Sequence, residues 1–188
     1  MTDHRPTGPG ALSPAAYPTT GLPQYDPRQS SPQAIREWLA SALPAGTKPD
    51  RNAPAGVTLL PLGEAVTAVR MSARLVHAAA RTSDPAELAD YLAQTLLGPV
   101  IHESAGTGRP YYALTPHRQR EWVLPGDAAY LATGTWLSFP DLDRRGPKGV
   151  HWVTPPRYRG DLCRIDHVCE FIVQGLRGLA PAAERDGR

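Results

Sequence analysis

One phrase occurs twice in this chain: an apolar run ended by proline, a basic stretch, and then Trp-Val-x-Pro. The first copy begins at Tyr112 and returns at Trp122, and the second begins at Trp136 and returns at Trp152. Proline has no N–H for the hydrogen-bond ladder of a sheet, so it ends a strand or lies at an edge. We interpret the two apolar runs as strands at the edges of one sheet, and the basic stretches as loops that could face a ligand.

Proline also divides the chain into regions. Ten of the 21 prolines precede Val57, and residues 1–30 carry few apolar side chains between them. Such a segment cannot bury enough apolar area to offset the entropy lost on ordering. We therefore expect a disordered tail over 1–30, a short helix and linker over 31–56, an α+β domain over 57–177 and a second disordered tail over 178–188.

Helix signals occur at four places. Ser31-Pro32 predicts a capped helix over 31–43, and Asp84-Pro85 with Glu87 predicts another that ends at Gly98-Pro99. Apolar spacing predicts a third helix over 161–176 and a short one over 72–80. Runs typical of strands cover 57–62, 65–71, 100–102, 111–115, 130–139 and 150–154. This order favours an α+β fold with a single, mostly antiparallel sheet packed against two or three helices.

Composition excludes several classes of function. The net charge is +2, from 20 basic and 18 acidic residues, so bulk charge does not indicate nucleic-acid binding. No apolar run approaches the roughly 18 residues of a membrane span, and the first ten residues contain no signal-peptide core. Cys163 and Cys169 are the only cysteines. We expect a reduced, cytoplasmic protein without membrane contact.

Two patterns suggest a metal, and neither supplies a complete ligand set. Asp141 and Asp143 form a D-x-D, but in a stretch rich in Arg and Gly that favours a solvated turn. Cys163 and His167 are four residues apart and could share a helix face, whereas Cys169 would point elsewhere and a fourth ligand is missing. We predict no metal site, no cofactor and no catalytic residue.

A third pattern, Gly106-Thr107-Gly108-Arg109, could hold a phosphate on backbone amides. It lacks the lysine and the following helix of a P-loop, so a hairpin turn is the favoured interpretation.

Arginine and tryptophan side chains are the best binding candidates. Arginine forks suit phosphates, and aromatic faces suit bases. The candidate binding residues are Arg109, Arg118, Arg120, Arg144, Arg145, Lys148, Trp122 and Trp152. The alternative is that the tryptophans fill the core and the basic side chains are solvated.

Several runs resemble a known family. They are Ala68–Ala73, Gly98–Ile101, Arg109–Pro116, Gly134–Pro140 and Gly146–Pro156. Their order is similar to the second half of primase–polymerase-like (prim-pol) domains, and to small actinobacterial, Streptomyces-type proteins that keep only that part. The resemblance implies a shared sheet scaffold. The acidic metal ligands that prim-pol enzymes need are not found before Val57, so it does not imply polymerase activity.

Two functions follow as hypotheses. The first is a non-enzymatic accessory or regulatory protein that binds an unknown protein partner through its Pro-rich tail and its 31–43 helix. The alternative is a nucleotide or nucleic-acid binding module that uses the basic loops on a degenerate prim-pol-like scaffold.

Overall fold

The computed structural model describes residues 28–46, 54–63, 65–105, 107–117, 122 and 126–180. The disordered tails predicted over 1–30 and 178–188 therefore lie outside the described residues, apart from 28–30 and 178–180.

The described residues form helices and antiparallel strands, which confirms the α+β class. The elements are α1 (Pro32–Ala40), β1 (Val57–Pro61), β2 (Thr67–Met71), α2 (Ala73–Ala80), α3 (Pro85–Leu96), β3 (Val100–Glu103), β4 (Tyr111–Thr115), β5 (Ala128–Leu131), β6 (Trp136–Pro140), β7 (Val150–Thr154) and α4 (Ile165–Leu179).

The strands divide into two sheets. Five strands pair in the order β5-β2-β4-β3-β7, and β1 pairs with β6. The prediction of one strand over 130–139 is wrong, because the chain turns at Gly134, whose φ is 92°, and β5 and β6 enter different sheets. The two copies of the repeated phrase are likewise not edges of one sheet: β4 lies inside the five-stranded sheet and β6 in the two-stranded one.

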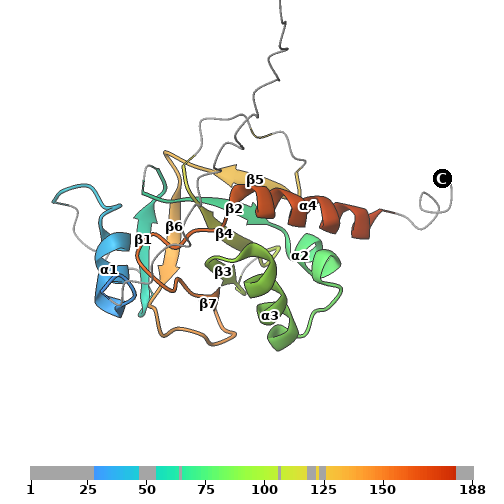
Figure 1. The fold of residues 1–188 in the computed structure, drawn as a ribbon, viewed down its shortest axis with the longest axis horizontal. Coiled ribbons are helices and arrows are strands. Elements are labelled where there is room, and N and C mark those ends of the chain that lie inside the picture. Colours follow the sequence, from blue (N-terminus) through green and yellow to red (C-terminus); the bar gives the residue numbers. More distant parts are fainter. Residues whose placement is uncertain are drawn as a thin grey trace, which may run out of the picture.

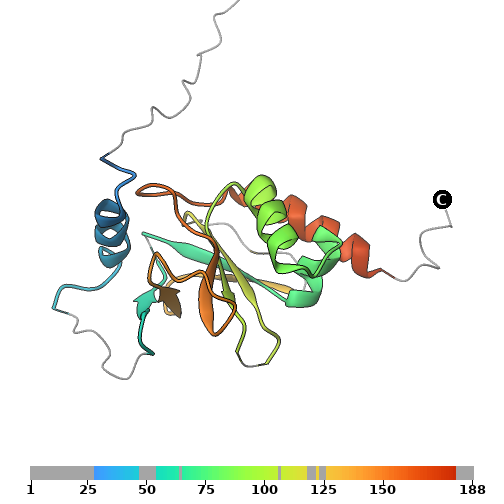
Figure 2. The ribbon, with the colours of Figure 1, turned by 90° about the horizontal axis from the view of Figure 1, so that it is seen from below.

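Three helices cover one face of the five-stranded sheet. Figure 2 shows α2, α3 and α4 together on this side. Their buried side chains, among them Leu75, Leu92 and Phe171, meet Met71 from the sheet. Helix α4 packs closely on α2 because Gly175 has no side chain: a Cβ there would lie 2.7 Å from the carbonyl oxygen of Leu75.

The opposite face of the sheet carries a second core. Figure 1 shows α1, β1 and β6 grouped at the other end of the molecule from α2, α3 and α4. Ile35, Trp38 and Leu39 of α1 are buried in this core, which also contains Trp152. The predicted helix is confirmed, with the Ser31 side chain accepting from the Ala34 amide, and its apolar face is occupied within the chain.

Helix α3 begins as predicted. The Asp84 carboxylate accepts hydrogen bonds from the amides of Ala86 and Glu87, which are otherwise unpaired at a helix start. Helix α4 differs from its prediction, since it begins at Ile165 and extends to Leu179.

Cys163 accordingly precedes α4 instead of lying on it. Its amide donates to the Leu114 carbonyl oxygen at 2.7 Å, which fixes this segment against β4. Cys163 therefore does not share a helix face with His167, an arrangement that the sequence allowed.

Candidate functional site

A transverse row of side chains crosses the helix-covered face of the sheet. Strand register places Ala128 opposite Met71, Met71 opposite Tyr111, Tyr111 opposite His102, and His102 opposite His151. Directly opposed residues on one face of a sheet have neighbouring side chains. The polar half of this row therefore lies on β4, β3 and β7.

This polar half forms the floor of a cavity of about 600 Å³. Its walls come from α2, the start of α3, the β3–β4 hairpin loop and the β6–β7 loop. The described lining residues are Ala73, His77, Ser83, Pro85, Leu88, Ala89, His102, Ser104, Arg109, Tyr111, Arg145, Pro147, His151, Trp152 and Val153. The volume falls within the range of small-molecule sites.

Ring contacts fix the floor of the cavity. His102 stacks on Tyr111, with 4.1 Å between ring centroids and 5° between planes. His151 meets His102 edge-on at 5.1 Å. From α2, the Nε2 of His77 lies 3.4 Å from the Tyr111 hydroxyl. Four rings from four elements thus hold one another in place.

Burial keeps the three imidazoles uncharged. Desolvation, assisted by the neighbouring charge of His151, lowers the pKa of His102 to about 4. Desolvation also lowers the pKa of His77 and of His151, and it raises the pKa of the Tyr111 phenol. At neutral pH these groups therefore donate and accept hydrogen bonds without carrying charge.

The charge of the cavity comes from arginine. Arg109 enters from the β3–β4 loop and Arg145 from the β6–β7 loop, and the described lining contains no Asp or Glu. The two loops are joined where the amide and the hydroxyl of Ser104 both donate to the Gly149 carbonyl oxygen. An anion in the cavity would therefore meet two guanidinium groups and no carboxylate.

The backbone at Arg109 is strained. Its φ is 40°, a region that costs a residue with a side chain about 1–2 kcal/mol. The other described non-glycine residues with positive φ, Arg81 and Leu97, lie at helix C-termini, where this conformation is a normal ending. Arg109 instead lies in the β3–β4 hairpin turn beside Gly108, whose φ is 83°, and tight hairpin turns take positive φ values.

The predicted binding residues separate in the structure. Arg109 and Arg145 line the cavity, whereas Arg144 donates to the Ala55 carbonyl oxygen at 2.6 Å and braces a loop. Lys148 is exposed outside the described lining. Arg118 and Arg120 lie outside the described residues, so the predicted relation between the two basic loops is untested.

The two predicted tryptophans are held by packing. Trp152 is buried in the second core and its indole N–H donates to the Pro140 carbonyl oxygen at 3.0 Å. Trp122 stacks on Tyr130 and donates to the Ala128 carbonyl oxygen at 3.1 Å. Both indoles are therefore engaged within the chain. Trp152 is also among the lining residues of the cavity, whereas Trp122 is not.

The two sequence patterns that suggested a metal do not form a ligand cluster among the described residues. Among the described residues, no group of three or more His, Cys, Asp or Glu side chains is placed to hold a metal ion. Asp141 and Asp143 are exposed after β6. Burial raises the pKa of the Cys163 thiol, which makes it a poor nucleophile or ligand.

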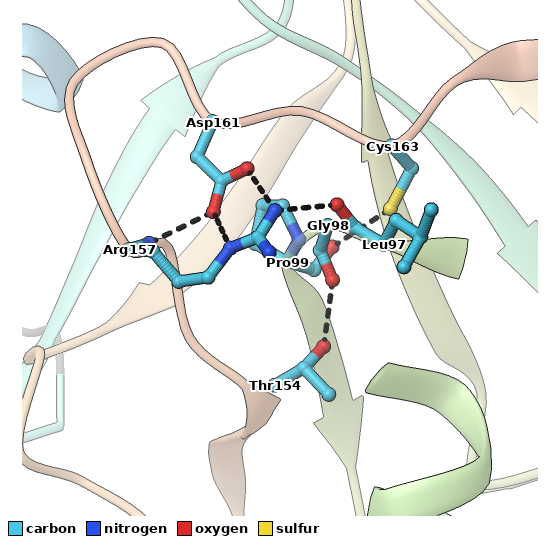
Figure 3. Close-up of polar contacts among 7 residues, drawn as sticks. All are labelled: Leu97, Gly98, Pro99, Thr154, Arg157, Asp161 and Cys163. Carbon is cyan, nitrogen blue, oxygen red and sulfur yellow. Dashed lines mark hydrogen bonds and ion pairs between the residues drawn. The ribbon is translucent and has the colours of Figure 1, made fainter. Parts of the chain in front are cut away.

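A second polar cluster lies beside the end of α3 (Figure 3). The Asp161 carboxylate, 0% exposed, accepts from the Arg157 amide at 2.8 Å and from its guanidinium at 2.9 Å on both oxygens. The same guanidinium donates to the Leu97 carbonyl oxygen at 2.7 Å. We call this the Arg157–Asp161 clasp. Because its buried carboxylate and its donors are bonded within the chain, it joins loops and offers little to a ligand.

Sequence reasoning missed the four rings of the cavity floor. The alternation of Val100 and His102 was a usable signal, since it places both side chains on one face of a strand. The approach of His151 and His77 depends on long-range pairing and helix docking, which no local pattern indicates.

Comparisons with known proteins give no relative from which a function could be carried over. The chain matches no protein-family model, no curated protein and no solved structure. Within the described residues, no helix has the length and apolar character needed to cross a bilayer.

Proposed function

We propose that this protein binds a free nucleotide, or a similar organic anion, in the cavity between α2, α3 and the two loops. The observation that carries the proposal is the charge of the described lining, which has Arg109 and Arg145 and no carboxylate. Guanidinium groups bind phosphates through paired hydrogen bonds.

The rest of the lining suits the uncharged part of such a ligand. Leu88, Pro85 and Val153 supply apolar wall, and neutral imidazoles supply hydrogen bonds. Small-molecule sites combine an apolar surface with a few oriented polar groups. The resemblance to prim-pol domains, whose ligands include nucleotides, supports the same class. We therefore propose a binding role for this cavity.

Calorimetric titration with ATP tests the proposal. Replacing Arg109 and Arg145 together with alanine should weaken ATP binding by about tenfold or more, since hydrogen bonds to charged groups contribute roughly 1.5–3 kcal/mol each. Lys148→Ala is the control for Arg145, because it removes one positive charge from the same β6–β7 loop at a position outside the described lining. Absence of ATP binding, or equal loss in the control, would refute the proposal. Binding of single-stranded DNA alone would instead favour a nucleic-acid interface.

A second proposal is contact with a partner protein, as an accessory or regulatory subunit. The supporting observation is Trp136, which is 52% exposed at the start of β6. Exposed tryptophan is enriched among residues that dominate protein interfaces. Removal of residues 1–27 leaves the buried α1 intact and tests the tail separately from Trp136→Ala. Unchanged co-purifying proteins in both variants would exclude this function.

A further inference from the structure

On the cavity floor, one buried nitrogen has no hydrogen-bond partner among the described residues, and it belongs to His102. This atom is the Nε2 of the ring. The other ring at this end of the row is satisfied, since the Nδ1 of His151 lies 3.2 Å from the Gly149 carbonyl oxygen. A buried polar atom without a partner costs about 1–3 kcal/mol.

The ring cannot turn away to find a partner elsewhere. Tyr111 stacks along one face at 4.1 Å and His151 contacts it edge-on at 5.1 Å. The strand register that places His102 opposite both residues fixes its backbone as well. His102 lines the cavity, and its Nε2 is covered in the ligand-free protein, so a ligand reaches this nitrogen by displacing the side chains that cover it.

Resting on the proposed function, we propose that His102 hydrogen-bonds the uncharged sugar or base of the bound nucleotide, and so makes the cavity selective for nucleoside phosphates over phosphate chains alone. Arg109 and Arg145, the only charged side chains in the described lining, take the phosphates. His102, neutral at pH 7 because burial lowers its pKa to about 4, has no electrostatic preference for an anion. Different residues thus contact the phosphates and the uncharged part of the ligand.

His102→Phe separates this role from a structural one. Phenylalanine keeps the stack on Tyr111 and removes both ring nitrogens. The change removes the unpaired Nε2, which favours folding, and also the contact of the imidazole with the Arg109 backbone, which opposes it. We expect the ligand-free melting temperature to change little. His151→Phe is the control, because it breaks a satisfied contact and should lower that temperature.

Titrations of ATP and of inorganic tripolyphosphate complete the test. In His102→Phe, ATP affinity should fall by about tenfold, the loss expected for one hydrogen bond in a desolvated site, while tripolyphosphate affinity stays within about twofold. Equal ATP affinity in the variant and the wild type would overturn the role of His102 and leave the proposed function standing. Equal loss for both ligands would also overturn it. A wild type that binds neither ligand would overturn both proposals.

Discussion

The Arg157–Asp161 clasp and the cavity floor are both polar and partly buried, and they differ in how completely their hydrogen bonds are made. In the clasp, three donors of Arg157 meet a carboxylate that is fully buried. In the cavity, His102 keeps an unpaired Nε2 and Arg109 keeps a strained backbone. Natural folds satisfy buried polar groups unless function requires otherwise. The contrast agrees with the proposed division of roles, in which the clasp serves stability and the cavity binds a ligand.

The largest effect should come from breaking the clasp. Arg157→Ala leaves the buried Asp161 carboxylate with the amide of residue 157 and the Tyr158 hydroxyl as donors and with no charged partner. Removing one partner of a buried pair costs about 3 kcal/mol. We expect the urea unfolding midpoint to fall accordingly, while ATP affinity of the folded protein is unchanged.

Arg164→Ala provides the matched control for the clasp. Arg164 lies 3.8 Å from Asp166, and both side chains are mostly exposed, so its loss should change stability by no more than about 0.5 kcal/mol. Equal destabilisation by the two variants, or loss of ATP binding in Arg157→Ala alone, would remove the distinction between clasp and cavity.

At Arg109 we expect a smaller effect with the reverse pattern: ATP affinity falls while the free energy of unfolding changes little. Arg109→Gly relieves the positive φ but adds the chain entropy of glycine, so the free energy of unfolding should change by less than about 1 kcal/mol. ATP affinity should fall about tenfold, because a guanidinium that contacts phosphate is lost. Calorimetry and urea unfolding on one preparation measure both quantities.

Arg81→Gly is the control for Arg109→Gly. Arg81 has a φ of 58° at the C-terminus of α2 and is not among the described lining residues. The two variants make the same change in charge and relieve the same kind of backbone strain. If Arg81→Gly weakens ATP binding as much, the effect is one of net charge and Arg109 has no special place.

Local signals in the sequence were sufficient for much of the fold. The Asp84-Pro85 start of α3 and the Ser31-Pro32 start of α1 could be predicted because a cap and a proline act within one turn of helix. The β3–β4 hairpin could be predicted because its strands are separated by a short glycine-containing turn. Each of these features is decided by residues close in sequence.

Long-range packing decided what the sequence did not reveal. A run from Tyr130 to Phe139 has the composition of one strand, and only the turn at Gly134 shows that it serves two sheets. Cys163 follows a helical pattern, yet its amide bonds to Leu114 and it stays outside α4. Only part of the cavity could be predicted. Arg109 and Arg145 were candidates because arginine suits phosphate, whereas His102 and His151 are brought together by strand register.

The smallest effect concerns pH and tests whether the cavity floor is neutral in the folded protein. An unfolded histidine has a pKa near 6.5. In the fold, burial first and then the charge of His151 lower the pKa of His102 to about 4, against a hydrogen bond with the Arg109 backbone that raises it. Above pH 6.5 neither state is protonated, so His102 adds no pH dependence. As pH falls from about 6.5 to 4, His102 binds a proton in the unfolded chain but not in the folded protein, so the free energy of unfolding decreases. Below about 4 both states are protonated and the decline from this residue ends.

The difference between wild type and His102→Phe reports this contribution together with its coupling to His151 and His77, because the carboxylates are the same in both proteins. Urea unfolding at pH 7.5, 6.0 and 5.0 should show the variant losing less stability than the wild type over this range. The residual slope of the variant reports His77 and His151, whose pKa values are also lowered by burial. Parallel curves would mean that His102 takes up its proton as readily in the fold as in the unfolded chain. The cavity floor would then be cationic in mild acid, and His102 would join the arginines in attracting phosphate instead of selecting the uncharged part of the ligand.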